Sequence, residues 1–274
     1  MINRYTVIGQ PIAHSLSPVI HQLFGELTQR KILYTRTEAT VENFNETVVN
    51  WQKSGGRGCN ITLPFKEQAL AVCDRLSAGA KRAASVNTIN MHRDGSRVGH
   101  NTDGLGLLVD LQQNLKFPLS GKRILLLGAG GAARGVVGPL LDAGPEIVHI
   151  VNRTEERAAS LAKAFVNDGP VQASGYTGLA DEAPFDLVIN ATSLSLQGDL
   201  PPLSDQVFAP VALAYDMMYA KNDTVFMTWS RDSGASVSNG FGMLVEQAAE
   251  AFLIWEDARP KTRMAWPRLH ELLS

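Results

Sequence analysis

Apolar positions along the chain follow two patterns, a helical period in some stretches and short continuous or alternating runs in others. In the first part of the chain, runs typical of strands cover residues 4–9, 32–39 and 58–63, and a further strand pair flanks the turn Asp94-Gly95. Helices are expected over 17–29 and 41–53, and another is expected to begin at Pro64. This alternation predicts a first α/β domain over residues 1–104.

From Gly121 onward the strand and helix signals alternate more regularly. The run Ile124–Leu127 is continuously apolar, as in a strand buried on both faces of a parallel sheet. Further strand-like runs cover 146–152, 185–192, 212–217 and 235–240, and helical runs include 132–143, 154–165 and 243–256. The pattern predicts a doubly wound parallel sheet over 121–240, joined to the first domain by a connector helix within 105–120.

Composition narrows the class of protein. The chain has 274 residues, of which 45% are hydrophobic and 19% charged, so it can build well-packed cores, and a disordered or disulfide-stapled chain is excluded. A net charge of −2 argues against nucleic acid as a main partner. Residues 1–120 carry 13 basic and 9 acidic side chains, which favours the first domain as the host of a small anionic substrate.

Nothing in the sequence predicts export, a membrane span or a metal site. No run approaches the roughly 18 apolar residues that a spanning helix needs, and the apolar stretch near the N-terminus is too short for a secretory signal. Cys59 and Cys73 lack metal-ligand spacing and are expected to be reduced thiols of a cytoplasmic protein.

The segment ILLLGAGGAARG, at 124–135, predicts a dinucleotide site. Gly128, Gly130 and Gly131 stand between a predicted strand and a predicted helix, where a Cβ would keep a pyrophosphate away from the backbone N–H groups. Ala133 fills the third position of the fingerprint, which permits close helix–strand packing. A tight strand–helix turn without a ligand is the alternative.

The residues after the next strand indicate which dinucleotide binds. An NAD site usually has Asp or Glu about 20 residues past the glycines, whereas this chain has Asn152, Arg153 and Thr154, with Arg157 one turn later. Guanidinium groups bind a 2′-phosphate, so NADP is favoured over NAD. A solvated helix start is the alternative, although cations there oppose the helix dipole.

Polar patches in the first domain suggest a substrate site. Ser15 and Ser17 precede Pro18 at a predicted helix start, where they could act as loop and cap residues or form a carboxylate cradle. Lys66 is expected in the first turn of the helix that Pro64 begins, where the positive helix end favours a neutral amine suited to proton transfer. A surface lysine is the ordinary alternative.

Three further positions carry similar alternatives. Asp103 could simply cap the connector helix, where an acid is stabilising. Asn87, in the segment Ser85–Thr88, is polar where packing alone would not require it. Gln247 lies on or beside the apolar stripe of 243–256, where it contacts either a polar ligand or a backbone group at a domain interface.

Taken in order, these motifs resemble the shikimate dehydrogenase family over essentially the whole chain. The motifs that carry the resemblance are HSLSP at 14–18, NITLPFK at 60–66, VNT at 86–88, NTDG at 101–104, GAGGAARG at 128–135, NRT at 152–154, NATS at 190–193, Asp216 with Tyr219, and GFGMLVEQAAEAF at 240–252. The resemblance implies reversible reduction of 3-dehydroshikimate to shikimate with NADPH, in the route to chorismate and the aromatic amino acids.

The resemblance also implies roles for individual residues. Lys66 and Asp103 would form the catalytic pair, and Ser15 and Ser17 would hold the substrate carboxylate. Further substrate contacts would come from Asn60, Thr62, Asn87, Tyr219 and Gln247. The cofactor would be held by Gly128, Ala129, Gly130, Gly131, Ala132, Asn152, Arg153, Thr154, Arg157, Met217 and Gly240. Because Gln247 must meet the substrate, the helices of 241–274 are expected to pack back on the first domain.

Two departures and two alternatives accompany the resemblance. Leu194-Ser195-Leu196 is bulkier than the small residues that the family often has after NATS, and Leu16 replaces a lysine found in many members. HSLSP also occurs in the quinate/shikimate branch, so a quinate/shikimate dehydrogenase with relaxed use of NAD and NADP is one alternative. A non-catalytic NADP(H) sensor is the other. A monomer or a homodimer without nucleic-acid or membrane partners is expected.

Overall fold

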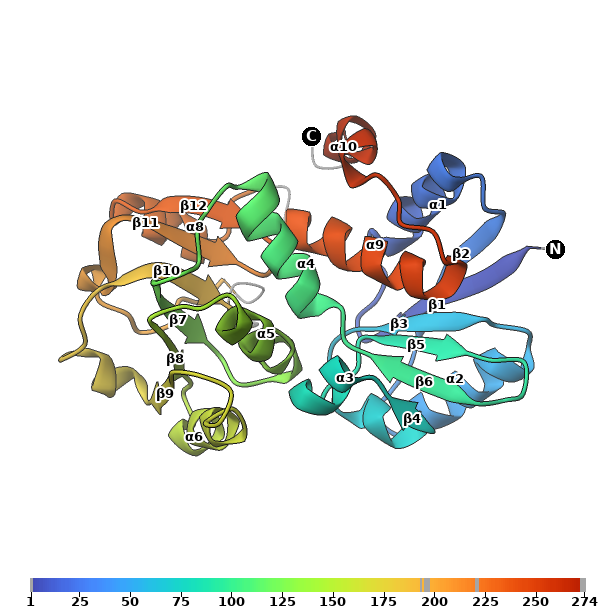
Figure 1. Ribbon diagram of the computed structural model, residues 1–274, viewed down its shortest axis with the longest axis horizontal. Helices are drawn as coiled ribbons and strands as arrows, with labels where there is room; N and C mark the ends of the chain where they lie inside the picture. The colour runs from blue at the N-terminus through green and yellow to red at the C-terminus, as the bar shows by residue number, and fades with distance from the viewer. Residues whose placement is uncertain (1, 193, 195–197, 220–221, 272–274) are drawn as a thin grey trace. The chain divides into compact units, whose positions relative to one another are not determined.

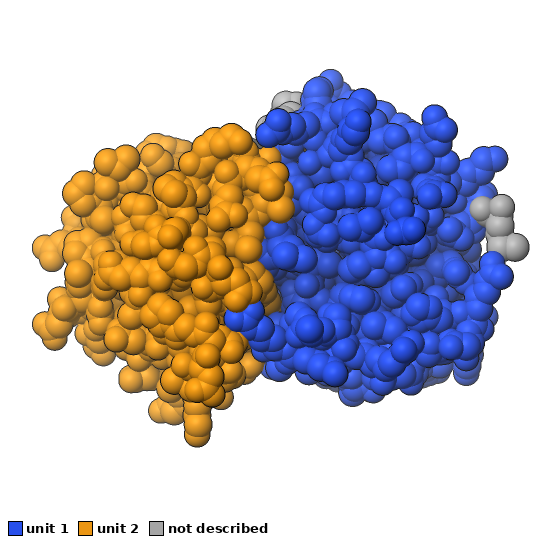
Figure 2. Space-filling view, viewed as in Figure 1, with its two compact units in different colours: residues 1–106, 244–274 blue, residues 107–243 orange. Residues whose placement is uncertain are grey.

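The computed structural model describes residues 2–192, 194, 198–219 and 222–271. The chain divides into two compact units, unit 1 with residues 1–106 and 244–274 and unit 2 with residues 107–243 (Figure 2). The two boundaries fall inside helices, one in α4 (Asp103–Val109) and the other in α9 (Phe241–Glu256). Each unit contains one six-stranded sheet.

The sheet of unit 1 is mixed and has the order β2-β1-β3-β5-β6-β4. Its strands are β1 (Asn3–Gly9), β2 (Ile32–Glu38), β3 (Gly58–Ile61), β4 (Arg75–Leu76), β5 (Thr88–Met91) and β6 (Arg97–His100). β1 is parallel to β2 and β3, whereas β5 is antiparallel to β3 and β6. The carboxyl ends of β1, β3 and β6 and the start of β5 therefore meet at one edge of the sheet, which is where the predicted polar patches lie.

Helices of unit 1 include α1 (Ser17–Thr28), α2 (Phe44–Lys53) and α3 (Ala78–Ala83). A buried cluster that includes Phe44, Phe65 and Ile89 forms part of its core. The prediction of a helix from Pro64 is wrong, because the Lys66 carbonyl accepts the Val86 N–H and the chain turns before a short 3₁₀ helix at Gln68–Val72.

The C-terminal helices α9 and α10 (Thr262–His270) extend unit 1, as the sequence predicted (Figure 1). The Tyr5 ring of β1 stacks on Trp255 of α9 with 4.5 Å between ring centroids, and the Tyr5 hydroxyl donates to Glu256 at 2.6 Å. The Trp255 indole N–H donates to the Ile89 carbonyl of β5 at 3.1 Å. These contacts fix the helix that carries Gln247 against the sheet of unit 1.

The sheet of unit 2 is parallel throughout, with the order β12-β11-β10-β7-β8-β9. Its strands are β7 (Arg123–Leu127), β8 (Ile147–Val151), β9 (Val171–Ser174), β10 (Phe185–Asn190), β11 (Phe208–Asp216) and β12 (Ser236–Asn239). Its helices include α5 (Gly131–Asp142), α6 (Glu155–Ala164) and α8 (Val225–Asp232). The strand order reverses between β7 and β10, and ligands of such sheets bind beside the carboxyl ends at this point.

Unit 2 confirms the predicted doubly wound sheet and adds the edge strand β9, which the sequence reading missed. β9 has the sequence VQAS and no fully buried residue, so it lacks the apolar signal of the central strands. Apolar side chains of β7 alternate between two buried clusters, with Ile124 and Leu126 in one and Leu125 and Leu127 in the other. In the part of the chain that the structure describes, no helix has the length and apolarity needed to cross a membrane.

Candidate active site

Lys66 and Asp103, 37 residues apart in the sequence, form an ion pair in unit 1. The Lys66 Nζ lies 2.7 Å from the Asp103 Oδ2, and the two side chains are only 13% and 6% exposed. The other carboxylate oxygen, Oδ1, accepts a hydrogen bond from the Asn87 amide at 2.8 Å. Both oxygens of Asp103 are thus held, and Lys66 retains further N–H donors for a reacting group.

The electrostatic environment of Lys66 differs from the one expected from the sequence. The amine was expected at the positive end of a helix, but residues around Lys66 form a turn and the 3₁₀ helix begins only at Gln68. Asp103, by contrast, is the first residue of α4, where a carboxylate favours the helix dipole. The tertiary pairing with Asp103, and not a helix terminus, therefore sets the electrostatic environment of Lys66.

Asn87 is the centre of a buried polar network beside this pair. Its amide also donates to the Thr102 hydroxyl at 2.9 Å, and its oxygen accepts the Thr102 backbone N–H at 2.8 Å. Gln247 joins the network, since its oxygen lies 3.4 Å from both the Asn87 amide and the Thr102 hydroxyl. Its own amide donates to the Leu244 carbonyl of the same helix at 2.9 Å, which is a backbone contact within α9, and a contact of Gln247 with a polar ligand stays a prediction.

Asn60 connects the network to the end of β3. Its amide donates to the Thr88 hydroxyl at 2.9 Å and to the Asn87 carbonyl at 3.2 Å, and its oxygen accepts the Tyr34 hydroxyl at 2.7 Å. Thr62 follows β3, and its methyl group packs so closely on Gly9 that a Cβ there would lie 2.4 Å away. Gly9 therefore lets the segment after β1 approach the segment after β3.

Ser15 and Ser17 lie in the segment that follows β1. Ser17 is the first residue of α1, and Leu16 is its cap position without a side-chain cap, so the cap role considered for Ser17 is wrong. The Ser15 hydroxyl instead accepts the Ser17 N–H at 3.3 Å. Ser17 is buried and Ser15 half-buried, at the same sheet edge as Asn60 and Thr62.

The glycine turn of unit 2 lies between β7 and α5, as predicted. Gly128 has φ +108°, and its N–H donates to the Val151 carbonyl at 2.7 Å, so this position needs glycine for its backbone. Gly130 is the cap residue of α5, which has no side-chain cap, and apart from Gly130 and its two chain neighbours no described residue has an atom within 4 Å of where its Cβ would be. An open space beside a helix N-terminus fits a pyrophosphate group.

The segment Asn152–Arg157 follows β8, the strand next to β7. Arg153 and Arg157 are both exposed, and the Asn152 amide donates to the Thr154 carbonyl at 2.8 Å, which fixes the turn into α6. Burial raises the pKa of Tyr176, and the charge of Arg153 acts in the opposite direction, so these two side chains lie near each other. The arrangement presents two guanidinium groups to solvent beside the glycine turn.

Met217 and Gly240 lie at the carboxyl ends of β11 and β12. The Gly240 backbone packs on Met217 so tightly that a Cβ would lie 2.2 Å from the Met217 carbonyl oxygen. Gly240 is therefore needed for close approach of the two segments. Tyr219, two residues after Met217, is half-buried in unit 2. Of the Leu194-Ser195-Leu196 segment, Ser195 and Leu196 lie outside the described residues.

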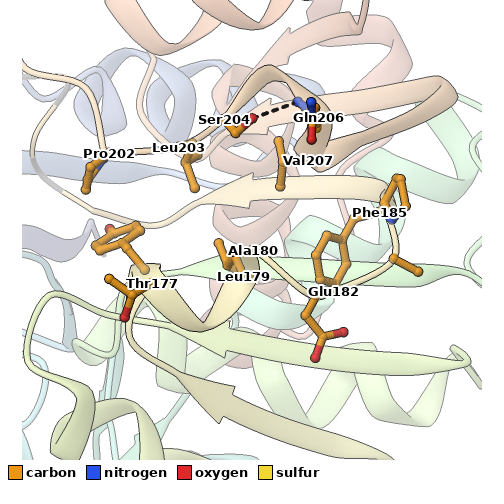
Figure 3. Close-up of a pocket in the computed structure, with 13 residues that line it drawn as sticks. Thr177, Leu179, Ala180, Glu182, Phe185, Pro202, Leu203, Ser204, Gln206 and Val207 are labelled. Atoms are coloured by element: carbon orange, nitrogen blue, oxygen red, sulfur yellow. Dashed lines mark hydrogen bonds between the residues drawn. The ribbon is translucent and has the colours of Figure 1, made fainter.

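A pocket of about 360 Å³ lies elsewhere in unit 2 (Figure 3). Thr177 and Leu179 line one side and Leu203 and Val207 the other, and the Glu182 carboxylate points away from Leu203 and Val207. None of the predicted substrate or cofactor residues lines this pocket. None of the residues that line it is a lysine, arginine or histidine, and the guanidinium of nearby Arg123 is paired with Glu182.

Sequence reasoning missed several side chains that support the site. Thr88 and Thr102 were within the quoted motifs but were not singled out, although hydroxyls inside a buried segment must find partners. Tyr34 and Arg36 lie on β2, and their two-residue spacing on one strand face was the only signal available. Among the described residues, no group of three metal-ligating side chains is assembled.

Comparison with known proteins identifies the family. Residues 7–89 match the family described as "Shikimate dehydrogenase substrate binding domain", and residues 110–197 match "Shikimate / quinate 5-dehydrogenase". A shikimate dehydrogenase (NADP(+)) of Aeromonas hydrophila is 50% identical over 263 residues, covering 96% of this chain and 95% of the relative. The chain belongs to the shikimate dehydrogenase family. Its activity is that of an NADP-dependent shikimate dehydrogenase, an oxidoreductase of the shikimate pathway.

Solved structures agree with this fold. An Ael1 enzyme from Pseudomonas putida is 43% identical with a TM-score of 0.89, covering 97% of this chain and 98% of that chain. A shikimate 5-dehydrogenase from Thermus thermophilus in complex with NADP(H) and shikimate is 33% identical with a TM-score of 0.86, covering 98% and 99%. NADP(H) is accordingly the cofactor, and the open space beside Gly130 fits its pyrophosphate.

Proposed function

We propose that Lys66 and Asp103 are the catalytic pair for the reversible reduction of 3-dehydroshikimate to shikimate. The observation that carries this proposal is the buried 2.7 Å contact between the Lys66 Nζ and the Asp103 Oδ2. NADPH, when bound, supplies a hydride to the carbonyl carbon. Negative charge then grows on the carbonyl oxygen, and the Lys66 ammonium stabilises that charge and donates the proton. In the oxidation direction Lys66 accepts the proton.

Asp103 orients Lys66 and binds a hydroxyl next to the reacting carbon. Asn87, which donates to Asp103, keeps the carboxylate in place, and it binds a ring hydroxyl in exchange for one of its present contacts with a threonine hydroxyl. Asn60, Thr62, Gln247 and Tyr219 bind further ring hydroxyls or the carboxylate. Asn60, Thr62 and Gln247 lie at the same sheet edge of unit 1, within the polar network around Asn87 or beside it, which supports this assignment.

Ser15 and Ser17 hold the substrate carboxylate. Hydroxyl groups at the start of a twelve-residue helix suit a carboxylate, because they add donors to the positive helix end. In unit 2, the backbone from Gly128 to Ala132 holds the pyrophosphate of NADP, and Asn152, Arg153, Thr154 and Arg157 hold its adenosine and 2′-phosphate. Met217 and Gly240 adjoin the nicotinamide.

These roles divide the chain into functional domains. Residues 1–104, with the helices of 241–274, bind the substrate, residues 121–240 bind NADP, and 105–120 connect them. The cytoplasm is the proposed compartment, which two cysteines without a disulfide support, and the proposed assembly is a monomer or a homodimer.

Lys66→Met tests the catalytic assignment. Loss of a proton-transfer group should lower turnover of shikimate with NADP about 10²–10⁴-fold, with a much smaller change in shikimate binding. Lys81→Met, in α3 of the same unit, is the matched control and should behave as the wild type. Near-normal turnover of Lys66→Met would overturn the assignment.

Substrate and cofactor range require a separate assay. NADPH or NADH formation should be followed with shikimate and with quinate, in the four pairings. Shikimate with NADP should be the best pairing by at least about tenfold in kcat/KM, because one lost charged hydrogen bond is worth roughly that factor. Comparable rates with quinate and NAD would instead show the relaxed quinate/shikimate alternative.

A further inference from the structure

Arg36 on β2 is hydrogen-bonded to the segment that contains Ser15 and Ser17. Its Nε lies 2.9 Å and its Nη2 2.6 Å from the Ser15 carbonyl oxygen, so two donors of one guanidinium converge on a single acceptor. The residue is otherwise exposed, in the second half of the edge strand β2. A long, exposed side chain fixed by two hydrogen bonds holds the backbone of Ser15 at a defined distance from β2.

Arg36 has no ion-pair partner among the described residues. No carboxylate of the described residues lies within ion-pair distance of its guanidinium, whereas Arg97 pairs with Asp74 and Arg268 pairs with Glu26. Arginine has five N–H donors, and the bonds to Ser15 use two of them. The remaining donors and the whole positive charge are available beside the two serines.

The proposed substrate residues otherwise lack net positive charge. Lys66 is paired with Asp103, and Asn60, Thr62, Asn87 and Gln247 are neutral. The substrate, however, carries a carboxylate, and hydroxyls with a helix end supply only partial charges. An unpaired guanidinium at the carboxylate end supplies what that set lacks.

We infer that Arg36 is a positioning residue for the substrate carboxylate: it holds the Ser15–Ser17 segment through the Ser15 carbonyl and supplies the charge that attracts the anion. This inference rests on the proposed role of the two serines. It assigns part of substrate recognition to β2, a strand without any residue that the family motifs single out.

The test compares Arg36→Gln, Arg36→Lys and the wild type in shikimate oxidation with NADP. Arg36→Gln should raise the KM for shikimate about tenfold or more, leave kcat within about twofold, and leave the KM for NADP unchanged.

Salt should weaken shikimate binding by the wild type and should have much less effect on Arg36→Gln. Arg36→Lys should keep the salt dependence but recover only part of the KM, because a lysine cannot make the two-pronged contact. Arg93→Gln, at the β5–β6 turn, is the charge control and should match the wild type.

A neutral probe separates charge from general disturbance of the loop. The methyl ester of shikimate lacks the anionic charge, so Arg36→Gln should weaken its binding, measured as a competitive inhibition constant, far less than it weakens binding of shikimate. An unchanged KM for shikimate in Arg36→Gln, or equal losses for acid and ester, would overturn the inference.

Ser15→Ala and Ser17→Ala distinguish failure of the proposed carboxylate site from failure of the proposed role of Arg36. If they raise the KM for shikimate while Arg36→Gln does not, only the role of Arg36 fails. If neither serine variant changes that KM, the proposed carboxylate site itself fails, and the inference about Arg36 fails with it.

Discussion

The proposed substrate site of unit 1 and the proposed cofactor turn of unit 2 differ in how far their residues are buried and held by one another. In unit 1, Lys66, Asp103 and Asn87 are buried or nearly buried, and Asp103 is hydrogen-bonded to both of the others. In unit 2, Arg153 and Arg157 are exposed, and Gly130 faces open space. Side chains that move protons need fixed positions and little water, whereas a phosphate can be held by backbone donors and long, adaptable cations.

Apart from Lys66→Met, the largest effect should come from breaking the network of unit 1. Asp103→Ala leaves the Lys66 ammonium without a carboxylate in a nearly buried position and removes an acceptor of the Asn87 amide. We expect turnover to fall about 10²–10³-fold. The free energy of unfolding should fall by about 3 kcal/mol, since a buried charge is left unpaired. Steady-state kinetics and urea unfolding measure the two effects.

Asp103→Asn is the matched variant. It keeps the shape and a hydrogen-bonding oxygen but removes the charge, so it should lose turnover to a similar degree and lose less stability. Wild-type turnover in Asp103→Ala would show that the buried pair is a structural contact, and the contrast between the two units would disappear.

Arg153→Ala tests the exposed residues of unit 2 that are proposed to bind the cofactor. Loss of about 1.5–3 kcal/mol of charged hydrogen bonding should raise the KM for NADPH at least about tenfold, with little change in stability because the side chain is exposed. Lys163→Ala, in the last turn of the helix α6 that follows Arg153, is the control. The NADPH:NADH preference, measured for each variant, should fall only in Arg153→Ala, and an unchanged preference contradicts the assignment.

The buried His21 of unit 1 should make the stability of the protein depend on pH. His21 is completely buried, and its ring stacks on Tyr34 at 4.3 Å, behind Asn60. Burial lowers the pKa of His21 to about 3, against about 6.5 in the unfolded chain. Between these values the unfolded chain takes up the proton and the folded chain does not. Stability from this group is therefore complete above pH 6.5 and decreases as the pH falls.

At pH 5 the decrease amounts to at most about 2 kcal/mol. His21→Gln cannot titrate, so its free energy of unfolding should change less between about pH 7.5 and pH 5 than that of the wild type. Burial also lowers the pKa of His100 and His149. These two groups make the free energy of unfolding depend on pH to the same extent in the wild type and in His21→Gln. Urea unfolding followed by tryptophan fluorescence suits the measurement, since Trp255 adjoins His21. Parallel pH dependences would contradict the prediction.

The smallest effect should come from a strained position in unit 2 that lies outside the cofactor turn. Val211 in β11 has φ +64° and is 90% exposed, beside a register shift in the pairing with β10. A β-branched residue is unfavourable there, so Val211→Gly should raise the free energy of unfolding by about 1 kcal/mol without changing activity. Val211→Ala keeps the Cβ and should gain less. A destabilised Val211→Gly would show that the valine makes a contact that compensates for the strain.

Much of the fold could be predicted because its signals are local. The apolar run of β7, the glycines after it and the arginines after β8 lie within about thirty residues of one another, and each depends on its own short segment. β9 and the turn at Lys66 could not be predicted. β9 is a half-exposed edge strand without an apolar pattern, and the Lys66 carbonyl accepts its hydrogen bond from Val86, which is distant in the sequence.

The sequence by itself determined the two α/β parts, the glycine turn and the identity of the polar residues, because periodicity and backbone requirements act over a few neighbouring positions. The family resemblance implied a pair of Lys66 and Asp103, but only the tertiary structure showed their direct contact, the hydrogen bond of Asn87 to the other carboxylate oxygen, and the hydrogen bonds of Arg36 to Ser15. Those three contacts join residues 37, 16 and 21 positions apart. They arise only when strand pairing brings the ends of β1, β3 and β6 and the start of β5 to one edge.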